Sequence, residues 1–191
     1  MKLQICDLCK QYDGRPVLDH VSMELESGPI YCLMAPSGSG KTTLFRILMG
    51  LETADSGRVV SSLRELRIGA VFQEDRLCEA FSAVDNVLIT ADASMSRETA
   101  KQELLELLPR ETLNRPVSTL SGGQKRRVAI CRALCALSDL LILDEPFTGL
   151  DAGTKNDVIR YLQKKSAGKL TLLSTHQEED VSALGGSVIT I

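Results

Sequence analysis

The chain has 191 residues, of which 43% are hydrophobic, 25% are charged and 4% are aromatic. This composition is typical of a globular protein with an aliphatic core, and it excludes a disordered chain, a collagen and a disulfide scaffold. The net charge of −3 encodes no general attraction to nucleic acid, so we expect no nucleic-acid partner. The chain contains no run of 18 apolar residues, and its N-terminus is too polar for a signal peptide. We therefore expect one cytoplasmic domain.

The first elements predicted along the chain are two strands, 3–8 and 17–25, around a turn at Asp13-Gly14. They indicate an antiparallel piece at the edge of a sheet. Short apolar runs then alternate with segments of helical periodicity. Buried strands are predicted at 30–34, 68–72, 140–143, 170–173 and 188–191, and helices at 42–51, 128–137 and 158–165. This alternation predicts an α/β fold with a mainly parallel sheet and helices on both faces.

Residues 78–119 contain no strand signal. Apolar residues at helical spacing from Ala100 to Leu108 predict an amphipathic helix that is capped by Ser96 and stopped by Pro109. We interpret this segment as a small helical subdomain inserted between two strands. The single domain, 1–191, would then consist of a core formed by about 1–73 and 120–191, and a subdomain of about 74–119.

The six cysteines are predicted to be buried, reduced thiols. Cys6-x-x-Cys9 has the spacing of a metal-binding or redox pair, but no second such pair follows it. The two histidines, His20 and His176, also lack the paired spacing of a zinc finger. We assign no metal role to the cysteines and a structural role to His20.

A glycine-rich segment follows the first buried strand of the expected parallel sheet and opens a helix. Its glycines, Gly38 and Gly40, allow a tight turn whose N–H groups face phosphate oxygens. Lys41 would reach the phosphates, and Thr42 offers a hydroxyl to Mg²⁺. The alternative is a glycine-rich turn with an exposed lysine. The segment nearly matches the phosphate-binding pattern G-x-x-x-x-G-K-[ST]: Ala35-Pro36-Ser37-Gly38-Ser39-Gly40-Lys41-Thr42-Thr43.

Ala35 stands where this pattern has its first glycine. Alanine with a positive φ would cost about 1–2 kcal/mol, whereas with a negative φ the cost is near zero. Pro36 pushes the preceding residue toward extended backbone. We therefore predict a negative φ at Ala35 and an ATP affinity that Ala35→Gly leaves unchanged.

The strand at 140–143 ends in two carboxylates, Asp144 and Glu145. Ligands of doubly wound sheets bind beyond the carboxyl ends of strands, where the phosphate loop also lies. Because side chains alternate along a strand, the two carboxylates point in opposite directions and cannot share one role. Asp144 suits Mg²⁺ coordination, and Glu145 suits activation of an attacking water. The alternative is a solvated acidic turn before Pro146.

A serine and two glycines precede the helix that runs to about residue 137. A serine cap and glycines at a helix N-terminus form a second anion-binding surface, Ser121-Gly122-Gly123-Gln124. One chain needs only one phosphate loop, so this surface suggests a composite site shared between two chains. The alternative is an ordinary helix cap. The cationic residues that follow, Lys125-Arg126-Arg127, are predicted to form a solvated face.

With these motifs in this order, the chain resembles the ATP-binding subunit of ABC transporters over essentially its full length. The segment from Ala35 to Thr43 resembles the Walker A loop, and Leu140 to Glu145 resembles Walker B with its adjacent glutamate. Leu120-Ser121-Gly122-Gly123-Gln124 is identical to the family signature. Shorter matches are Phe72-Gln73 with the Q-loop, Thr148-Gly149-Leu150-Asp151 with the D-loop, Ser174-Thr175-His176 with the switch histidine, and Tyr12 with the aromatic residue that stacks on adenine.

The resemblance implies a P-loop NTPase of ABC type that uses ATP and Mg²⁺. Two chains would pair head to tail, with each ATP between the phosphate loop of one and the signature of the other. Ser121, Gly122, Gly123, Gln124 and Asp151 would thus act in trans. Catalysis would involve Glu145, His176 and Gln73, and Mg²⁺ would be held by Thr42, Gln73 and Asp144. Each of three residues has a structural alternative: Tyr12 as ordinary packing, Gln73 as a polar residue at a strand end, and His176 as a hydrogen-bonded loop histidine.

The resemblance also implies integral membrane partner subunits, with the chain peripheral on the inner face of the cell membrane. A cytoplasmic helix of these subunits would dock beside Gln73, with Leu77 and Phe81. The segment Phe72-Gln73-Glu74-Asp75-Arg76-Leu77 is similar to importers of the nitrate, sulfonate and taurine group. We expect no accessory regulatory domain, because the chain ends at Ile191. A homodimer and a heterodimer both stay open. So do a non-transport ABC ATPase and a regulatory module that binds ATP without hydrolysing it.

Overall fold

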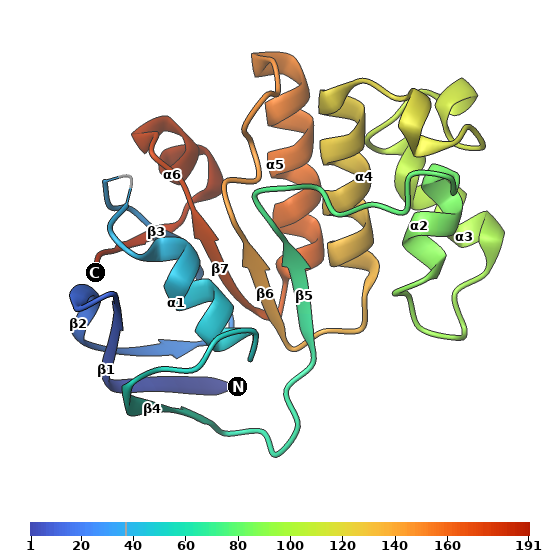
Figure 1. Ribbon diagram of the computed structural model, residues 1–191. Coiled ribbons are helices and arrows are strands. Elements are labelled where there is room, and N and C mark those ends of the chain that lie inside the picture. Colours follow the sequence, from blue (N-terminus) through green and yellow to red (C-terminus); the bar gives the residue numbers. More distant parts are fainter. Residues whose placement is uncertain (37) are drawn as a thin grey trace.

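The computed structural model describes residues 1–36 and 38–191 and contains two sheets (Figure 1). The antiparallel sheet has the order β2-β1-β4 and consists of β1 (Lys2–Tyr12), β2 (Arg15–Glu26) and β4 (Ser56–Ser61). Asp13 and Gly14 form the turn between β1 and β2, with φ of 49° and 76°. Positive φ at both central residues is what a tight two-residue hairpin requires. The predicted antiparallel hairpin is confirmed, but it belongs to a sheet of its own and does not pair with a described edge strand of the parallel sheet.

Sequence analysis missed β4. Five of its six residues are exposed, and its sequence has no apolar alternation. The strand exists because β1 offers a free edge, on which Leu3 pairs with Ser61 and Ile5 with Val59. Pairing with a distant strand, rather than local pattern, therefore creates β4.

The second sheet is parallel and has the order β5-β6-β7-β3-β8. Every residue of β6 and β7 is buried, as expected for strands with helices on both faces. All five predicted strands are confirmed: the strand at 140–143 has its predicted bounds, and the ends of the other four are shifted by one or two residues. They are β3 (Ile30–Leu33), β5 (Ile68–Val71), β6 (Leu140–Leu143), β7 (Leu170–Ser174) and β8 (Ser187–Ile189).

Helices cover both faces of this sheet (Figure 1). Alternate residues of β6 face opposite sides: Leu140 and Ile142 pack with α1 (Lys41–Leu48) and the antiparallel sheet, whereas Leu141 and Leu143 pack with the helices of the other face. Those helices include α4 (Gly122–Cys135) and α5 (Ala152–Ser166), and α6 (Glu178–Leu184) precedes β8. The predicted extension of α1 to Leu51 is wrong, because the helix ends at Leu48 and Leu51 is exposed.

The segment between β5 and α4 is helical, as predicted. It contains α2 (Ala83–Leu88), α3 (Arg97–Leu105) and two 3₁₀ turns, η1 (Arg110–Thr112) and η2 (Val117–Thr119). Ser96 caps α3 by accepting a hydrogen bond from Thr99 N at 3.0 Å. The helix ends earlier than predicted, and Leu107 and Leu108 are buried in the turn that follows it. The division into core and subdomain remains our interpretation.

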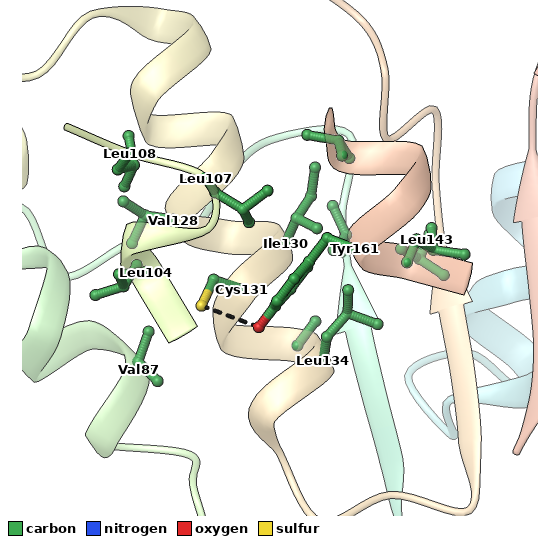
Figure 2. Close-up of a cluster of buried hydrophobic side chains, with 14 of the residues drawn as sticks. Val87, Leu104, Leu107, Leu108, Val128, Ile130, Cys131, Leu134, Leu143 and Tyr161 are labelled. Carbon is green, nitrogen blue, oxygen red and sulfur yellow. Dashed lines mark hydrogen bonds between the residues drawn. The ribbon is translucent and has the colours of Figure 1, made fainter. Parts of the chain in front are cut away.

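The helical segment and α5 share one apolar cluster with α4 (Figure 2). Leu104 of α3, Val128 and Cys131 of α4, and Tyr161 of α5 are all nearly inaccessible to solvent. Among the described residues, no helix is both long and apolar enough to cross a membrane.

Candidate functional site

The candidate site lies at the carboxyl ends of four neighbouring parallel strands. The register aligns Val71 with Leu143, Leu143 with Leu173, and Leu33 with Ser174. The residues that follow β5, β6, β7 and β3 therefore meet at one edge of the sheet, where doubly wound folds bind their ligands.

The glycine-rich loop adopts the backbone that a phosphate cradle needs. Gly38 and Gly40 have φ of 82° and 95°, and a Cβ on Gly40 would lie 2.5 Å from the carbonyl oxygen of Val17. Only glycine is tolerated there, and α1 begins at the next residue, Lys41. N–H groups at a helix N-terminus attract anions. Ser37 lies outside the described residues.

Lys41 is buried, and its ammonium group lies against this loop. Its Nζ donates to the carbonyl oxygens of Ala35 at 2.5 Å and Pro36 at 2.9 Å. Ala35 is not among the described non-glycine residues with positive φ, so the predicted negative φ is confirmed. The Oγ of Ser39 is buried without a hydrogen-bond partner among the described residues. The loop thus presents a cation and an unpaired hydroxyl, which suit a phosphate ligand.

Thr42 and Asp144 come together from opposite parts of the chain. Thr42 Oγ1 donates to Asp144 Oδ2 at 2.8 Å, and Ser174 Oγ donates to Asp144 Oδ1 at 2.7 Å. A hydroxyl and a carboxylate are hard oxygen donors of the kind that Mg²⁺ prefers. The donor set therefore fits the ion that the sequence suggested.

Glu145 occupies a strained position directly after β6. Its φ is 47°, in the left-handed region that a side chain rarely adopts. Its N–H donates to Ser174 Oγ at 2.8 Å, and its Oε1 lies 2.7 Å from His176 Nε2. The carboxylate thus faces His176, whereas that of Asp144 faces Thr42. Strand alternation does not decide where Glu145 points, because β6 ends at Leu143 and the backbone of Glu145 is left-handed. The separate roles of the two carboxylates stay a prediction.

One cleft brings most of these groups together. Gln73, two residues after the end of β5, is exposed and lines the cleft together with residues of the glycine-rich loop. The cleft is lined by Val17, Gly38, Gly40, Lys41, Thr42, Thr43, Gln73 and Glu145.

The serine-glycine surface lies elsewhere on the same chain. Ser121 Oγ accepts from Gln124 N at 3.3 Å and Gln124 Oε1 accepts from Ser121 N at 2.9 Å, which forms a capping box at the start of α4. Ser121 and Gly122 are exposed, and no residue of 121–124 is among the described residues that line the cleft. The surface therefore faces solvent.

Asp151 and Tyr12 also stand apart from the cleft lining. Asp151 caps α5 by accepting from Thr154 N at 3.0 Å, and this bonding to Thr154 lowers the pKa of its carboxyl group. Tyr12 lies at the end of β1, 42% exposed, with Lys10 Nζ 5.2 Å from its ring. Their predicted contacts with nucleotide remain predictions.

The predicted solvated face at residues 125–127 is wrong. Lys125 pairs with Glu79 at 3.0 Å, and Arg127 donates to carbonyl oxygens of the chain. Arg126 is 4% exposed. A helical-wheel count was the available signal, because Arg126 lies three, four and seven residues before Ala129, Ile130 and Ala133 on the buried face of α4.

Sequence analysis also gave no role to Ser174, which bonds both Asp144 and Glu145. The signal was a hydroxyl residue directly after the apolar pair Leu172-Leu173 at the end of the strand. All six cysteines are free, but the expectation of burial holds only for Cys32 and Cys131: Cys6, Cys9 and Cys135 are partly buried and Cys78 is exposed. His20 bonds Asp7 at 2.7 Å on the antiparallel sheet.

A glycine-rich loop that opens a helix beside an acidic strand end defines a P-loop α/β protein. Residues 18–148 match the ABC transporter family, and the chain belongs to this family. The sulfate/thiosulfate import ATP-binding protein CysA of Xylella fastidiosa is 37% identical over 207 residues, which cover 98% of this chain and 60% of that protein. CysA of Vibrio vulnificus is 36% identical over 210 residues, covering 100% of this chain and 61% of that protein.

The chain thus spans about 60% of the length of these curated relatives. Among solved structures, a dimeric post-hydrolysis state of the ATP-binding cassette MJ0796 bound to ADP and Pi has a TM-score of 0.86. It is 26% identical in sequence, and the match covers 99% of this chain and 94% of that one. The α/β P-loop fold of ABC type is therefore confirmed.

Proposed function

We propose that the chain binds ATP with Mg²⁺ and hydrolyses it as the ATP-binding subunit of an ABC importer. The observation that carries this proposal is the placement of Glu145 between His176 and the glycine-rich loop, beside the Thr42–Asp144 pair. The curated relatives are import ATP-binding proteins, which supports the direction of transport. Their named substrate, sulfate/thiosulfate, differs from the nitrate, sulfonate and taurine group that residues 72–77 suggest.

Nucleotide binding would rest on the loop and on α1. The N–H groups around Gly38 and Gly40 and the helix N-terminus would surround the phosphates, and Lys41 would exchange its carbonyl partners for phosphate oxygens. Thr42, Asp144 and Gln73 would hold Mg²⁺. When bound, this ion supplies neutralisation of the phosphate charge.

Hydrolysis would depend on the carboxylate of Glu145 as the general base that orients the attacking water and takes its proton. His176 holds Oε1 of that carboxylate and would contact the γ-phosphate when the site closes. The left-handed backbone at Glu145 costs about 1–2 kcal/mol. Strain of this kind is retained where it serves a functional geometry.

A second chain would complete the site. Residues 121–124 lie outside the cleft of their own chain and expose a capped helix N-terminus. We therefore assign Ser121, Gly122, Gly123 and Gln124, together with Asp151, to the ATP bound by the partner. The dimeric state of the related cassette supports this arrangement. The partner would be either an identical chain or an unlike cassette.

The membrane subunits would dock beside the Q-loop segment, which places the chain at the inner face of the membrane. A groove there is lined by Met49, Leu51, Ile68, Ala70, Phe72, Arg76, Thr90 and Arg132. Phe81 is 49% exposed and available for contact, whereas Leu77 packs against the apolar cluster of α4 and is a weaker candidate than expected. Phe81→Asp should uncouple ATP hydrolysis from transport while ATP binding persists. Unaltered transport would exclude Phe81 from the docking site.

The decisive test of hydrolysis is Glu145→Gln. Loss of a general base lowers turnover by about 10²–10⁴-fold, so we expect this loss with ATP binding retained and the dimer trapped. Phosphate release and equilibrium ATP binding measure the two effects. Glu179→Gln, an exposed carboxylate on α6, is the control. Normal turnover in Glu145→Gln contradicts the proposed role.

Transport is tested by capture of the tagged Glu145→Gln chain with ATP from solubilised membranes. Recovery of a polytopic membrane protein is the expected result and identifies the route of the cargo. Recovery of only non-membrane partners or nucleic acid would retain the ATPase chemistry and overturn the transport function.

A further inference from the structure

The side chain of Arg126 is buried deep in the molecule, directly behind the candidate site. It is 5% exposed and projects from α4, whose N-terminus is the capped Ser121. Its carboxylate partner is Asp75, at 3.1 Å. Burial of a guanidinium is unfavourable unless its N–H groups are satisfied, so the remaining partners of Arg126 indicate what the residue holds.

One edge of the guanidinium holds the end of β5. Nη1 donates to the carbonyl oxygen of Phe72 at 2.6 Å and lies 3.4 Å from that of Gln73. The same nitrogen bonds the carboxylate of Asp75. These contacts fix the backbone of the segment that presents Gln73 to the cleft.

The other edge holds the end of β6. Nη2 donates to the carbonyl oxygens of Asp144 at 2.7 Å and Glu145 at 2.6 Å, and Nε donates to that of Pro146 at 3.2 Å. The N–H of Glu145 is bonded on its other side by Ser174 Oγ. The peptide groups flanking the strained Glu145 are thus held by Arg126 and Ser174.

We propose that Arg126 is a positioning residue for ATP hydrolysis, because its guanidinium holds Glu145 in the left-handed conformation and fixes Gln73 at a set position relative to it. This inference rests on the proposed function. Gly122 to Arg126 belong to one continuous helix, so the same contacts also tie the 121–124 surface to Glu145.

The geometry requires arginine. A planar guanidinium directs N–H groups along two edges, which here reach two different strand ends. A lysine ammonium is a point charge on a flexible stem, so it would keep the charge beside Asp75 but would not span both strand ends. Arg126→Lys is therefore a substitution that removes the positioning and retains the charge.

The test compares steady-state ATP hydrolysis of the full chain and of Arg126→Lys. We expect kcat to fall by about 10-fold or more with the KM for ATP changed less than about threefold, because Arg126 bonds no described residue of the phosphate loop. Arg67→Lys is the control. Arg67, directly before β5, forms a bidentate pair with Asp139, directly before β6, at the end of these strands away from the site. Parent-like kcat in a folded Arg126→Lys chain overturns the proposal.

A double-substitution cycle separates positioning from a general loss of structure. If Arg126 acts through Glu145, adding Arg126→Lys to Glu145→Gln should leave the single-turnover rate within about threefold of Glu145→Gln alone. A further loss as large as that in the parent background overturns the proposal. Where Arg126→Lys does not fold, by circular dichroism, Arg126→Gln is the second variant. Failure of both to fold would make Arg126 a structural residue only.

The same measurements distinguish this inference from the proposed function. If the parent chain releases no phosphate from ATP, the proposed function fails and the inference fails with it. The other outcome is that the parent hydrolyses ATP and Glu145→Gln does not. If Arg126→Lys then has the kcat of the parent, the proposed function holds and only the inference about Arg126 fails.

Discussion

The five-stranded sheet and the helical segment of residues 78–119 hold their side chains in place by different means. In the sheet, β6 and β7 are buried along their whole length and bonded to a strand on each side. In the segment, the longest helix has nine residues, too few to be stable alone. Its conformation rests on packing in the apolar cluster shared with α4 and α5, to which side-chain caps, a buried amide and ion pairs are added. The residues of the candidate site, such as Asp144 and Glu145, follow directly after these hydrogen-bonded strands, where the backbone is held most tightly.

Asn86 shows how the segment is held. Its side chain is fully buried, accepts from Cys78 N at 2.8 Å, and donates to the carbonyl oxygens of Cys78 and Ser82 at 3.1 and 3.0 Å. A second attachment leads to α5, where Glu103 of α3 accepts from Tyr161 at 2.8 Å and pairs with Lys165 at 2.5 Å. Tyr161 packs among the apolar residues of Figure 2.

The largest effect is expected for Leu141→Ala in β6. Leu141 is fully buried in the central part of the sheet. Removing a buried leucine leaves a cavity and lowers the free energy of unfolding by about 2–5 kcal/mol. Denaturant unfolding measures this loss, which we expect to appear as reduced amide protection across the whole sheet.

Leu104→Ala is the matched substitution in the helical segment, because Leu104 is also fully buried. Its loss of amide protection should be concentrated in residues 78–119 and leave β6 and β7 protected. Equal loss of protection in both regions would show that sheet and segment unfold as one unit, and the contrast drawn above would then be wrong.

Asn86→Ala should have the next largest effect. The substitution leaves a buried N–H and two carbonyl groups without their partner, which lowers the free energy of unfolding by about 1–3 kcal/mol. Urea denaturation measures the change. Asn114→Ala, at an exposed position of the same segment, is the control and should be within about 0.5 kcal/mol of the parent. A parent-like midpoint for Asn86→Ala would mean that apolar packing alone holds the segment.

Glu103→Gln should lower the free energy of unfolding by about 1 kcal/mol at pH 7, because it removes an ion pair between α3 and α5. Burial raises the pKa of Glu103, but hydrogen bonds from Lys165 and Tyr161 outweigh burial and bring the pKa below its ordinary value. The carboxylate therefore stabilises the fold above the unfolded pKa of about 4.3, and this contribution disappears as pH falls through the lower folded value.

The difference between parent and Glu103→Gln should consequently shrink as pH is lowered from 7 to about 3.5. Unfolding curves of both chains across this range provide the measurement. A difference that grows on acidification would mean that the folded pKa of Glu103 is raised rather than lowered.

The smallest perturbation is thiol labelling, which leaves the fold unchanged. Burial, together with the charge of Asp180, raises the pKa of the Cys32 thiol in β3 to about 11, so about one molecule in 10³ carries the thiolate at pH 8. Cys78 is exposed at the start of the helical segment. Iodoacetamide should modify Cys78 first and reach Cys32 only on unfolding, as mass spectrometry of digests would show. Equal modification rates would place Cys32 outside the protected sheet.

Local patterns predicted much of the fold and of the site. The strand at 140–143 was predicted at its observed bounds, because an apolar run of this length, bounded by polar residues, indicates a buried strand and is too short for a helix. The strand β4 and the end of α1 were not predicted, since pairing with β1 and the turn at Met49 decide them. The burial of Arg126 could have been inferred from the apolar periodicity of α4, but its partners could not, because they are carbonyl groups about 20 and 50 residues away.

The sequence by itself determined the alternation of strands and helices in the parallel sheet and the identity of the chemical groups after each of its strands, because these depend on neighbouring residues. Tertiary structure alone decided which strands are adjacent. That order brings Thr42 to Asp144 across 102 positions and places Ser174 and Arg126 around Glu145. The reason is physical: strand pairing and the partners of buried polar groups are set by contacts between distant segments, which no local pattern encodes.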